Sequence, residues 1–323
     1  MSEAILVPPK KKASVVSKKR LLRTWKSVMK HRVLYFMMIP GLIYFLVFRY
    51  LPLWNAQIAF KNFQPLLGIE ASPFMENLFE HFETFINSFY FSQLIGNTLI
   101  LSLMKLSMGM PIAIILALCI YESMYKRLAR FVQTISYVPH FLSWVIMFGI
   151  LLVMLSPGEG LINEVIKSTG NEPIPFMLSP QWFRWVVVWS DIWKETGWGT
   201  IFYLAALMAI DPTLFEAAAV DGASRLQRIW FISLPGILPT IVVVTLLRLG
   251  SILDAGFYQI FVLYSLPVYS VSDIIDTWVY RQGVLEFQFS MATAVGLFKG
   301  AIGLALVLVA NRLAKRITGS GLY

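Results

Sequence analysis

Only one cysteine occurs in the 323 residues, Cys119, and it lies within an apolar stretch. A single thiol excludes an intramolecular disulfide bond, and we expect this one to be a buried, inert packing residue. Charged residues are also scarce, at 14% compared with about 25% in soluble globular proteins. This composition argues against an ordinary soluble domain. The 57% of hydrophobic residues predicts several membrane-spanning helices, each of about 20 residues.

The sequence has few of the residue patterns that catalysis or metal binding requires. Its three histidines, His31, His81 and His140, are far apart and do not have the spacing of metal ligands. It contains no GxxxxGKS/T phosphate loop, since Lys167-Ser168 lacks the preceding glycine. It also lacks a nucleophile elbow. We therefore expect no catalytic residue, no bound metal ion and no ATP hydrolysis by this chain.

Six apolar stretches are long enough to cross a membrane. They predict an all-α integral membrane protein with six transmembrane helices. In the long loop after the first stretch, phenylalanines recur at helical spacing and predict a short helix at the outer membrane interface; they are Phe79, Phe82, Phe85 and Phe89. The expected spans are residues 33–50, 93–120, 132–155, 183–210, 237–265 and 291–313.

Positive charge is concentrated on one side of these spans. Residues 1–32 contain ten Lys and Arg against one acid, and the segments on the same side hold 18 cations in total. The opposite loops hold four, namely Arg49, Lys61, Lys167 and Arg281. By the positive-inside rule, both termini lie in the cytoplasm. The net charge of +9 therefore reflects orientation and contact with anionic lipid, and we expect no nucleic-acid partner.

The segment between the fourth and fifth spans, EAAAVDGASRLQRIWFISLP at 216–235, has the signals of a helical hairpin. Asp211 is suited to cap a helix that begins at the next residue. Gly222 suits the left-handed residue that ends such a helix. Ser224 and Gln227 have the spacing of a capping box, which begins a second helix. The charge distribution places this hairpin in the cytoplasm.

This hairpin resembles the EAA loop of ABC importer permeases, the cytoplasmic element that docks on the ATPase subunit. The alternative interpretation is a plain cytoplasmic helix hairpin between two spans. We expect Leu234-Pro235 to end the second helix. The residues that match the motif, and that the resemblance implies couple the chain to the ATPase, are Glu216, Ala217, Ala218, Asp221, Gly222, Ala223, Ile232, Leu234 and Pro235.

The resemblance extends beyond the hairpin. Residues 96–118 and 191–207 are similar to the shared core of binding-protein-dependent sugar permeases, and residues 289–323 to the branch that handles oligo- and polysaccharides. The overall likeness within that branch is to importers of alginate. The division that follows is a basic cytoplasmic tail at 1–32, a first transmembrane helix and outer loop at 33–92, a type I ABC transmembrane core at 93–313 with the EAA-like loop at 212–235, and a cytoplasmic end at 314–323.

The resemblance implies a permease subunit of an ATP-driven importer in the bacterial cytoplasmic (inner) membrane. Its substrate would be an oligo- or polysaccharide, including an acidic, alginate-like one, and would cross by alternating access. The implied partners are a second, related permease subunit, two ATPase subunits, an external solute-binding protein and membrane lipid. No cofactor would be bound by this chain, because ATP and Mg would be held by the partner ATPases.

Several charged and aromatic residues lie within the expected spans. A charge at a lipid-facing centre costs about 2.5–3.5 kcal/mol, so these residues should face the protein interior or a wet cavity. They fit two interpretations, ion pairing that fixes helix packing and a polar pathway for a sugar, and Asp191 or Glu195 with Lys194 could form pairs on one helix surface. The aromatic residues either stack on sugar rings or pack between helices. The candidate pathway residues are Lys105, Trp189, Asp191, Trp193, Lys194, Glu195, Arg248, Asp254 and Lys299, and Trp185 and Trp198 are also in the fourth span.

Two other functions are compatible with a multi-pass membrane protein. An ion-coupled secondary transporter would use the intramembrane charges, but such proteins often show internal repeats, and none is evident here. A membrane enzyme acting on glycan or lipid would need a cluster of catalytic residues at one interface. No such cluster is evident in the sequence, and dependence of uptake on ATP distinguishes the importer from the secondary transporter.

Overall fold

The computed structural model describes residues 29–318. Most of the basic tail predicted at 1–32 and the last five residues of the C-terminal end lie outside these described residues. The described part is helical, and its β-structure is limited to an isolated bridge between Lys61 and Phe74. The chain divides into two units, one ending at Gln57 and one beginning at Ile58, which we describe separately.

The first unit is built on one long apolar helical stretch. It contains α2 (Arg32–Phe45), the π-helical turn η1 (Leu46–Tyr50) and α3 (Leu51–Asn55). The helical stretch that they begin runs from Arg32 to Phe60 and is 29 residues long. Pro40 lies inside α2 without breaking it. The first predicted span is therefore confirmed and is longer than expected, because the chain continues as helix beyond residue 50.

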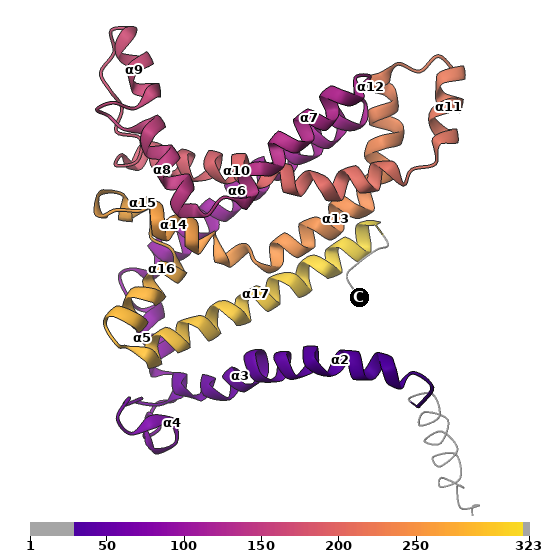
Figure 1. Ribbon diagram of the computed structural model, residues 1–323. Helices are drawn as coiled ribbons and strands as arrows, with labels where there is room; N and C mark the ends of the chain where they lie inside the picture. Colours follow the sequence, from indigo (N-terminus) through magenta and orange to yellow (C-terminus); the bar gives the residue numbers. More distant parts are fainter. Residues whose placement is uncertain (1–28, 319–323) are drawn as a thin grey trace, which may run out of the picture. The chain divides into compact units, whose positions relative to one another are not determined.

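The second unit contains the other helices of the described chain (Figure 1). Long helices alternate with short ones that form the connections at both ends. In chain order they are α4 (Gly68–Ala71), α5 (Glu80–Ile86), α6 (Phe91–Tyr121), α7 (Lys126–Tyr137), α8 (Trp144–Leu155), α9 (Leu161–Ser168), α10 (Pro180–Met208), α11 (Pro212–Val220), α12 (Arg225–Arg228), α13 (Leu234–Gly250), α14 (Phe257–Leu263), α15 (Tyr269–Ser272), α16 (Ile275–Tyr280) and α17 (Phe289–Thr318).

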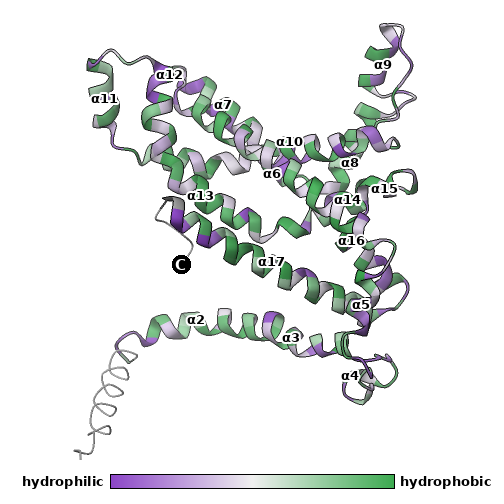
Figure 2. Cartoon of the chain, turned by 180° about the vertical axis from the view of Figure 1, so that it is seen from behind, coloured by the Kyte–Doolittle hydropathy of each residue, from purple (hydrophilic) through white to green (hydrophobic). Residues whose placement is uncertain are grey.

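The packing of this unit centres on α6 and α10, which form the most extensive contact between two elements. One apolar cluster includes Leu101 of α6 and Val187 of α10, together with residues of α14. A second, toward the other end of the same helices, includes Ala117 and Tyr203. Apolar residues run along α13 and α17, whereas hydrophilic residues gather at α12 (Figure 2). The pattern is that of helices whose outer faces contact lipid.

Four helical stretches of the described chain are long and apolar enough to cross a membrane, or up to six if each of two bent pairs counts as one span. The third predicted span is not one helix: α7 and α8 meet at 108°. Pro139 lies in the short 3-10 turn between them, and Ser143 then caps α8 through the amide of Ile146. The fifth predicted span is also interrupted, because α13 ends at Gly250 and α14 begins at Phe257.

Two smaller expectations are corrected. Cys119 is exposed on α6 and is not a buried packing residue. The predicted aromatic helix is the seven-residue α5. Its Phe85 is only 1% exposed and contacts the rings of Trp278 and Phe298, so it is a core residue, whereas Phe89 remains exposed.

Candidate functional site

The hairpin between α10 and α13 has the local geometry that its sequence predicts. A carboxylate oxygen of Asp211 accepts a hydrogen bond from the amide of Thr213 at 2.9 Å, which caps α11 and lowers the pKa of this carboxyl. Gly222 has φ +75°, the left-handed conformation that glycine adopts at least cost. Ser224 and Gln227 form the capping box that begins α12. The predicted starts of both helices and the turn between them are confirmed.

The end of the second helix was predicted wrongly. Leu234-Pro235 does not end it, because α12 continues through the π-helical turn η4 (Ile229–Ser233) into α13. Proline is tolerated in the first turn of a helix. The π-helical turn before Pro235, with its i→i+5 hydrogen bonds, shifts the hydrogen-bond register of the helix at this point. Residues Arg225–Gly250 therefore form one helical stretch of 26 residues that leads from the hairpin into the membrane span.

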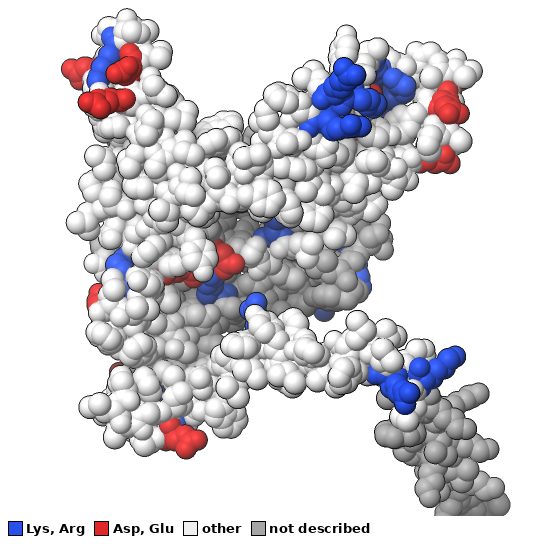
Figure 3. Space-filling view, viewed as in Figure 1, with Lys and Arg blue, Asp and Glu red and all other residues white. Residues whose placement is uncertain are grey.

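The hairpin projects from one end of the second unit (Figure 1). Most of the residues that match the EAA motif are exposed there, including Glu216, Asp221 and Gly222. Ala218, Ala223, Ile232 and Leu234 are half-buried, and Leu234 packs against the apolar cluster of α6 and α10. Basic residues at the start of α7 and on α12 form a patch beside the acidic residues in α11 and at its ends (Figure 3). The basic residues are Lys126, Arg127, Arg130, Arg225 and Arg228.

The other end of α13 is a helix break with unusual backbone conformations. Ala255 has φ +47° and Gly256 has φ +84° between the end of α13 and the start of α14. Backbone groups freed at membrane depth need partners inside the protein. Helix α6 supplies them: the Ser102 hydroxyl donates to the carbonyl of Ile252, and the Lys105 ammonium donates to the carbonyl of Ala255 at 2.9 Å. The break is thus fixed by two polar side chains of α6.

Lys105 is held from three directions. Besides Ala255, its ammonium lies 3.3 Å from the Asp191 carboxylate of α10 and donates to the side-chain oxygen of Gln259. Gln259 in turn donates to the carbonyl of Val187 at 2.7 Å. A Cβ at Gly256 would lie 2.6 Å from the Lys105 ammonium. Glycine is therefore required there both by φ and by the close approach of the lysine.

A cavity of about 140 Å³ opens at this break. Of the candidate pathway residues, the structure brings Lys105, Asp191 and Arg248 together in its wall. Arg248 lies near the end of α13 and is half-buried, and a Cβ at Gly199 would be 3.3 Å from its guanidinium. The lining residues are Ser102, Lys105, Leu106, Asp191, Arg248, Ser251, Ile252, Ala255 and Gly256.

Two other candidate residues belong to a separate ion cluster. Lys299 of α17 contacts Asp254 at 2.5 Å and also donates to both oxygens of Asp276 at 2.8 and 2.7 Å. Asp276 lies on α16, so Lys299 connects Asp254 in the helix break to both α16 and α17. The geometry of Lys299 and Asp254 therefore fits ion pairing that fixes helix packing, the first of the two interpretations of these charges.

Lys194 and Glu195 form a third cluster at the bend between α7 and α8. The Lys194 ammonium donates to the carbonyl of His140 at 2.5 Å and lies 3.5 Å from Glu195. The His140 ring contacts Glu195 at 2.9 Å and stacks on Trp198 with ring centres 4.5 Å apart. The expected pair of Lys194 with Glu195 is present, whereas Asp191 pairs with Lys105 instead.

The tryptophans of α10 line an apolar groove. Trp185, Trp189 and Trp193 share one face of the helix and border a space of about 680 Å³, together with Trp182 and residues of α8 and α9. Trp198 lies outside this groove, on His140. The groove is almost entirely apolar, which favours contact with another apolar surface over a polar sugar. Trp189 and Trp193 line this groove and not the charged cavity.

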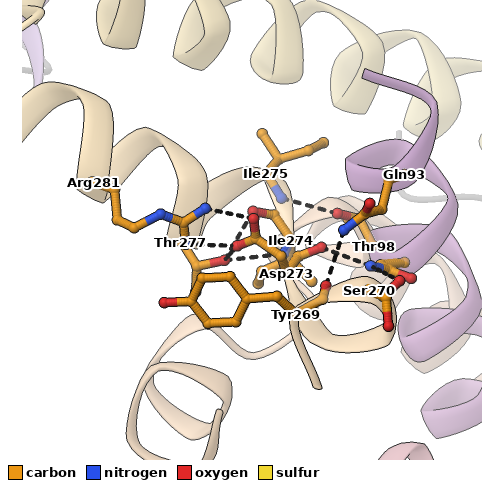
Figure 4. A network of polar contacts seen from close by, with 10 residues as sticks. Gln93, Thr98, Tyr269, Ser270, Asp273, Ile274, Ile275, Thr277 and Arg281 are labelled. Atoms are coloured by element: carbon orange, nitrogen blue, oxygen red, sulfur yellow. Dashed lines mark hydrogen bonds and ion pairs between the residues drawn. The ribbon is translucent and has the colours of Figure 1, made fainter. Parts of the chain in front are cut away.

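Sequence reasoning missed a polar network at the end of α6 (Figure 4). Arg281 donates to both carboxylate oxygens of Asp273, at 2.8 and 2.5 Å. Burial opposes the charge on Arg281, but its hydrogen bonds to Asp273 outweigh this effect and raise the pKa of the guanidinium. Asn97 of α6 donates to the carbonyl of Asp273 at 3.0 Å, and Arg184 of α10 donates to Asn97 at 2.8 Å. The network ties the segment around α15 and α16 to α6 and α10.

Comparisons with known proteins agree with this architecture. The family described as "Binding-protein-dependent transport system inner membrane component" matches residues 109–319. The polygalacturonan/rhamnogalacturonan transport system permease protein YteP of Bacillus subtilis (strain 168) is 42% identical over 323 residues, which is 100% of both chains.

Two solved structures have the same fold over nearly the whole chain. One is a bacterial ABC transporter involved in the import of the acidic polysaccharide alginate, with 43% identity, a TM-score of 0.83 and coverage of 92% of this chain and 99% of that one. The other is a bacterial alginate ABC transporter in complex with an alginate pentasaccharide-bound periplasmic protein, with 42% identity, a TM-score of 0.84 and coverage of 93% and 100%. They confirm the all-α ABC importer fold and the resemblance to alginate importers that the sequence predicts. The chain belongs to the family of inner-membrane components of binding-protein-dependent transport systems.

Proposed function

We propose that this permease subunit moves an acidic oligo- or polysaccharide into the cell, driven by ATP hydrolysis in two partner ATPase subunits that dock on the α11–α12 hairpin. ATP and Mg are held by those partners. A second, related permease completes the pathway, and an external binding protein delivers the saccharide. Both termini and the hairpin face the cytoplasm, as the charge distribution indicates.

The observation that carries this proposal is the continuous helix from Arg225 to Gly250. At one end it begins at the exposed hairpin, and at the other it ends at the polar cavity beside Arg248 and Ser251. A movement imposed on the hairpin can therefore be transmitted along one continuous helical stretch to the cavity. This is the connection that alternating access requires, because the two states must differ at both sites.

The substrate class is supported by the relatives. The one named for polygalacturonan and rhamnogalacturonan covers the whole chain, and the solved structures are of transporters of alginate. Galacturonan and alginate share sugar units that carry carboxylates. The partner set is supported in the same way, since one of these transporters was captured with a saccharide-bound periplasmic protein.

Reconstitution of the complete transporter in lipid vesicles tests the proposal. The chain is co-expressed with the genes of its partner subunits, and uptake of labelled oligogalacturonate is measured with ATP, without ATP, and with an ion gradient alone. We expect uptake only with ATP and binding protein present, and co-purification of a different permease and an ATPase. Uptake driven by an ion gradient without ATP would instead support a secondary transporter.

A further inference from the structure

The polar cavity at the helix break has an uncompensated positive charge. Its wall contains two cations, Lys105 and Arg248, and one acid, Asp191. Asp191 lies 3.3 Å from Lys105, so these two neutralise each other. In the described part of the chain, the Arg248 guanidinium has no ion-pair partner and donates no hydrogen bond.

The two cations differ in what they can still bind. The ammonium of Lys105 is already directed at Asp191, at the carbonyl of Ala255 and at Gln259, and these contacts use its three donors. Arg248 retains all five donors of its guanidinium. It is half-buried, and glycine at position 199 leaves space beside it, since a Cβ there would lie 3.3 Å from the guanidinium. Arg248 is therefore the group in this wall that can bind a ligand.

An unpaired charge at membrane depth is expensive and is rarely retained without a function. A guanidinium presents a planar fork of donors that matches the two oxygens of a carboxylate. The cavity of about 140 Å³ has room for a carboxylate with a few waters, since one water occupies about 30 Å³. Ser102 and Ser251 lie in the same wall. Their hydroxyls donate to the carbonyls of Ile252 and Arg248 and can still accept hydrogen bonds from sugar hydroxyl groups.

We propose that Arg248 binds the carboxylate of a uronic acid unit as the saccharide passes the helix break, and that this contact determines the preference of the pathway for acidic over neutral sugars. The proposal rests on the proposed function as a saccharide importer. Arg248 lies at the end of the helix that begins at the hairpin, so the movement that opens the pathway also moves the carboxylate contact.

The first test compares an acidic saccharide with its neutral form. ATP-dependent uptake of short oligogalacturonates and of their methyl esters is measured for the reconstituted wild-type transporter, Arg248→Gln and Arg248→Lys. We expect Arg248→Gln to lower the acid-to-ester uptake ratio about tenfold or more, the effect of losing a charge-assisted hydrogen bond, and Arg248→Lys to keep part of it. Arg312→Gln removes an exposed cation on α17; it is the matched control and should keep the wild-type ratio.

The second test does not depend on transport. The purified transporter complex is treated with phenylglyoxal, and the adduct at Arg248 is quantified by mass spectrometry with no sugar, with oligogalacturonate and with its methyl ester. We expect modification without sugar, and protection by the acid but not by the ester. Absence of modification, equal modification in all three samples, or an unchanged uptake ratio in Arg248→Gln would overturn the inference. Protection in a complex that shows no ATP-dependent uptake would support the carboxylate contact and refute the proposed function.

Discussion

The Lys105 ammonium of α6 lies 3.3 Å from the Asp191 carboxylate of α10, and both side chains are largely buried. The pair joins the two helices whose contact is the most extensive in the second unit. Lys105 also binds the carbonyl of Ala255 in the helix break. A single side chain therefore connects helix packing, the break and the wall of the cavity.

The ion pair of Lys105 with Asp191 predicts how the loss of one of the two charges changes stability. Lys105→Met leaves Asp191 without a counterion, and we expect it to lower the free energy of unfolding by about 3–5 kcal/mol. The double variant Lys105→Met with Asp191→Leu leaves no charge unpaired and should recover much of that stability. Thermal unfolding of the two variants and of the wild type, in the same detergent, measures the difference. A double variant no more stable than Lys105→Met would contradict the pairing.

A second prediction concerns the turn of the hairpin. Gly222 has φ +75°, and no atom lies within 4 Å of the position that a Cβ would take. A change of residue there acts through backbone conformation and not through collision. Gly222→Val should distort the turn, because a β-branched residue with positive φ is strained, and should uncouple ATP hydrolysis from uptake while the protein still inserts in the membrane.

Gly222→Asn is the matched variant, because asparagine tolerates the left-handed conformation. We expect it to keep a nearly normal ratio of sugar taken up to ATP hydrolysed, whereas Gly222→Val lowers that ratio. Both quantities are measured in the same vesicle preparation. Normal coupling in Gly222→Val would argue against a docking role for this turn.

Local signals in the sequence were sufficient to predict the hairpin and most of the membrane spans. The caps at Asp211 and Ser224 and the left-handed Gly222 depend on neighbouring residues only, and the structure contains all three. Hydropathy likewise located α6, α10 and α17. The breaks in the third and fifth spans were missed because apolar composition continues across them. The turn at Ser251–Gly256 is stabilised by Ser102 and Lys105, which are about 150 residues away in the chain.

The sequence also did not predict which charged residues form ion pairs with each other. Lys194 and Asp191 are close in the chain, yet Asp191 pairs with Lys105 on another helix. Asp273 and Arg281 are predicted as ordinary loop charges, yet they pair in the structure, where Arg281 begins the π-helical turn η7 (Arg281–Leu285) after α16. Contacts between helices decide these pairs, and one sequence does not specify which helix faces meet.

The cap of α11 predicts a response to acid. Hydrogen bonding to the amide of Thr213 lowers the pKa of Asp211 below its ordinary value of 3.8. A lowered pKa means that the stabilisation of the helix start is complete above that value and is lost as the pH falls through the pKa of the folded protein. Protection of the Thr213 amide from hydrogen exchange should therefore be constant near neutral pH and decline only in strong acid. Asp211→Asn keeps an uncharged acceptor and should remove the decline. The same decline in Asp211→Asn would show that the cap is not its cause.

The last prediction tests the orientation of the chain. Cys119 is exposed and is replaced by serine to give a background without thiols. Val220→Cys then marks the hairpin, and Val165→Cys marks α9 at the opposite side; the wild-type valines are 88% and 65% exposed. A membrane-impermeant maleimide added to intact cells with the outer envelope opened should label Val165→Cys but not Val220→Cys, which should react only after the inner membrane is permeabilised. Because the proposed ATPase partners would reach the hairpin only from the cytoplasm, labelling of Val220→Cys from outside would exclude the docking role of the hairpin.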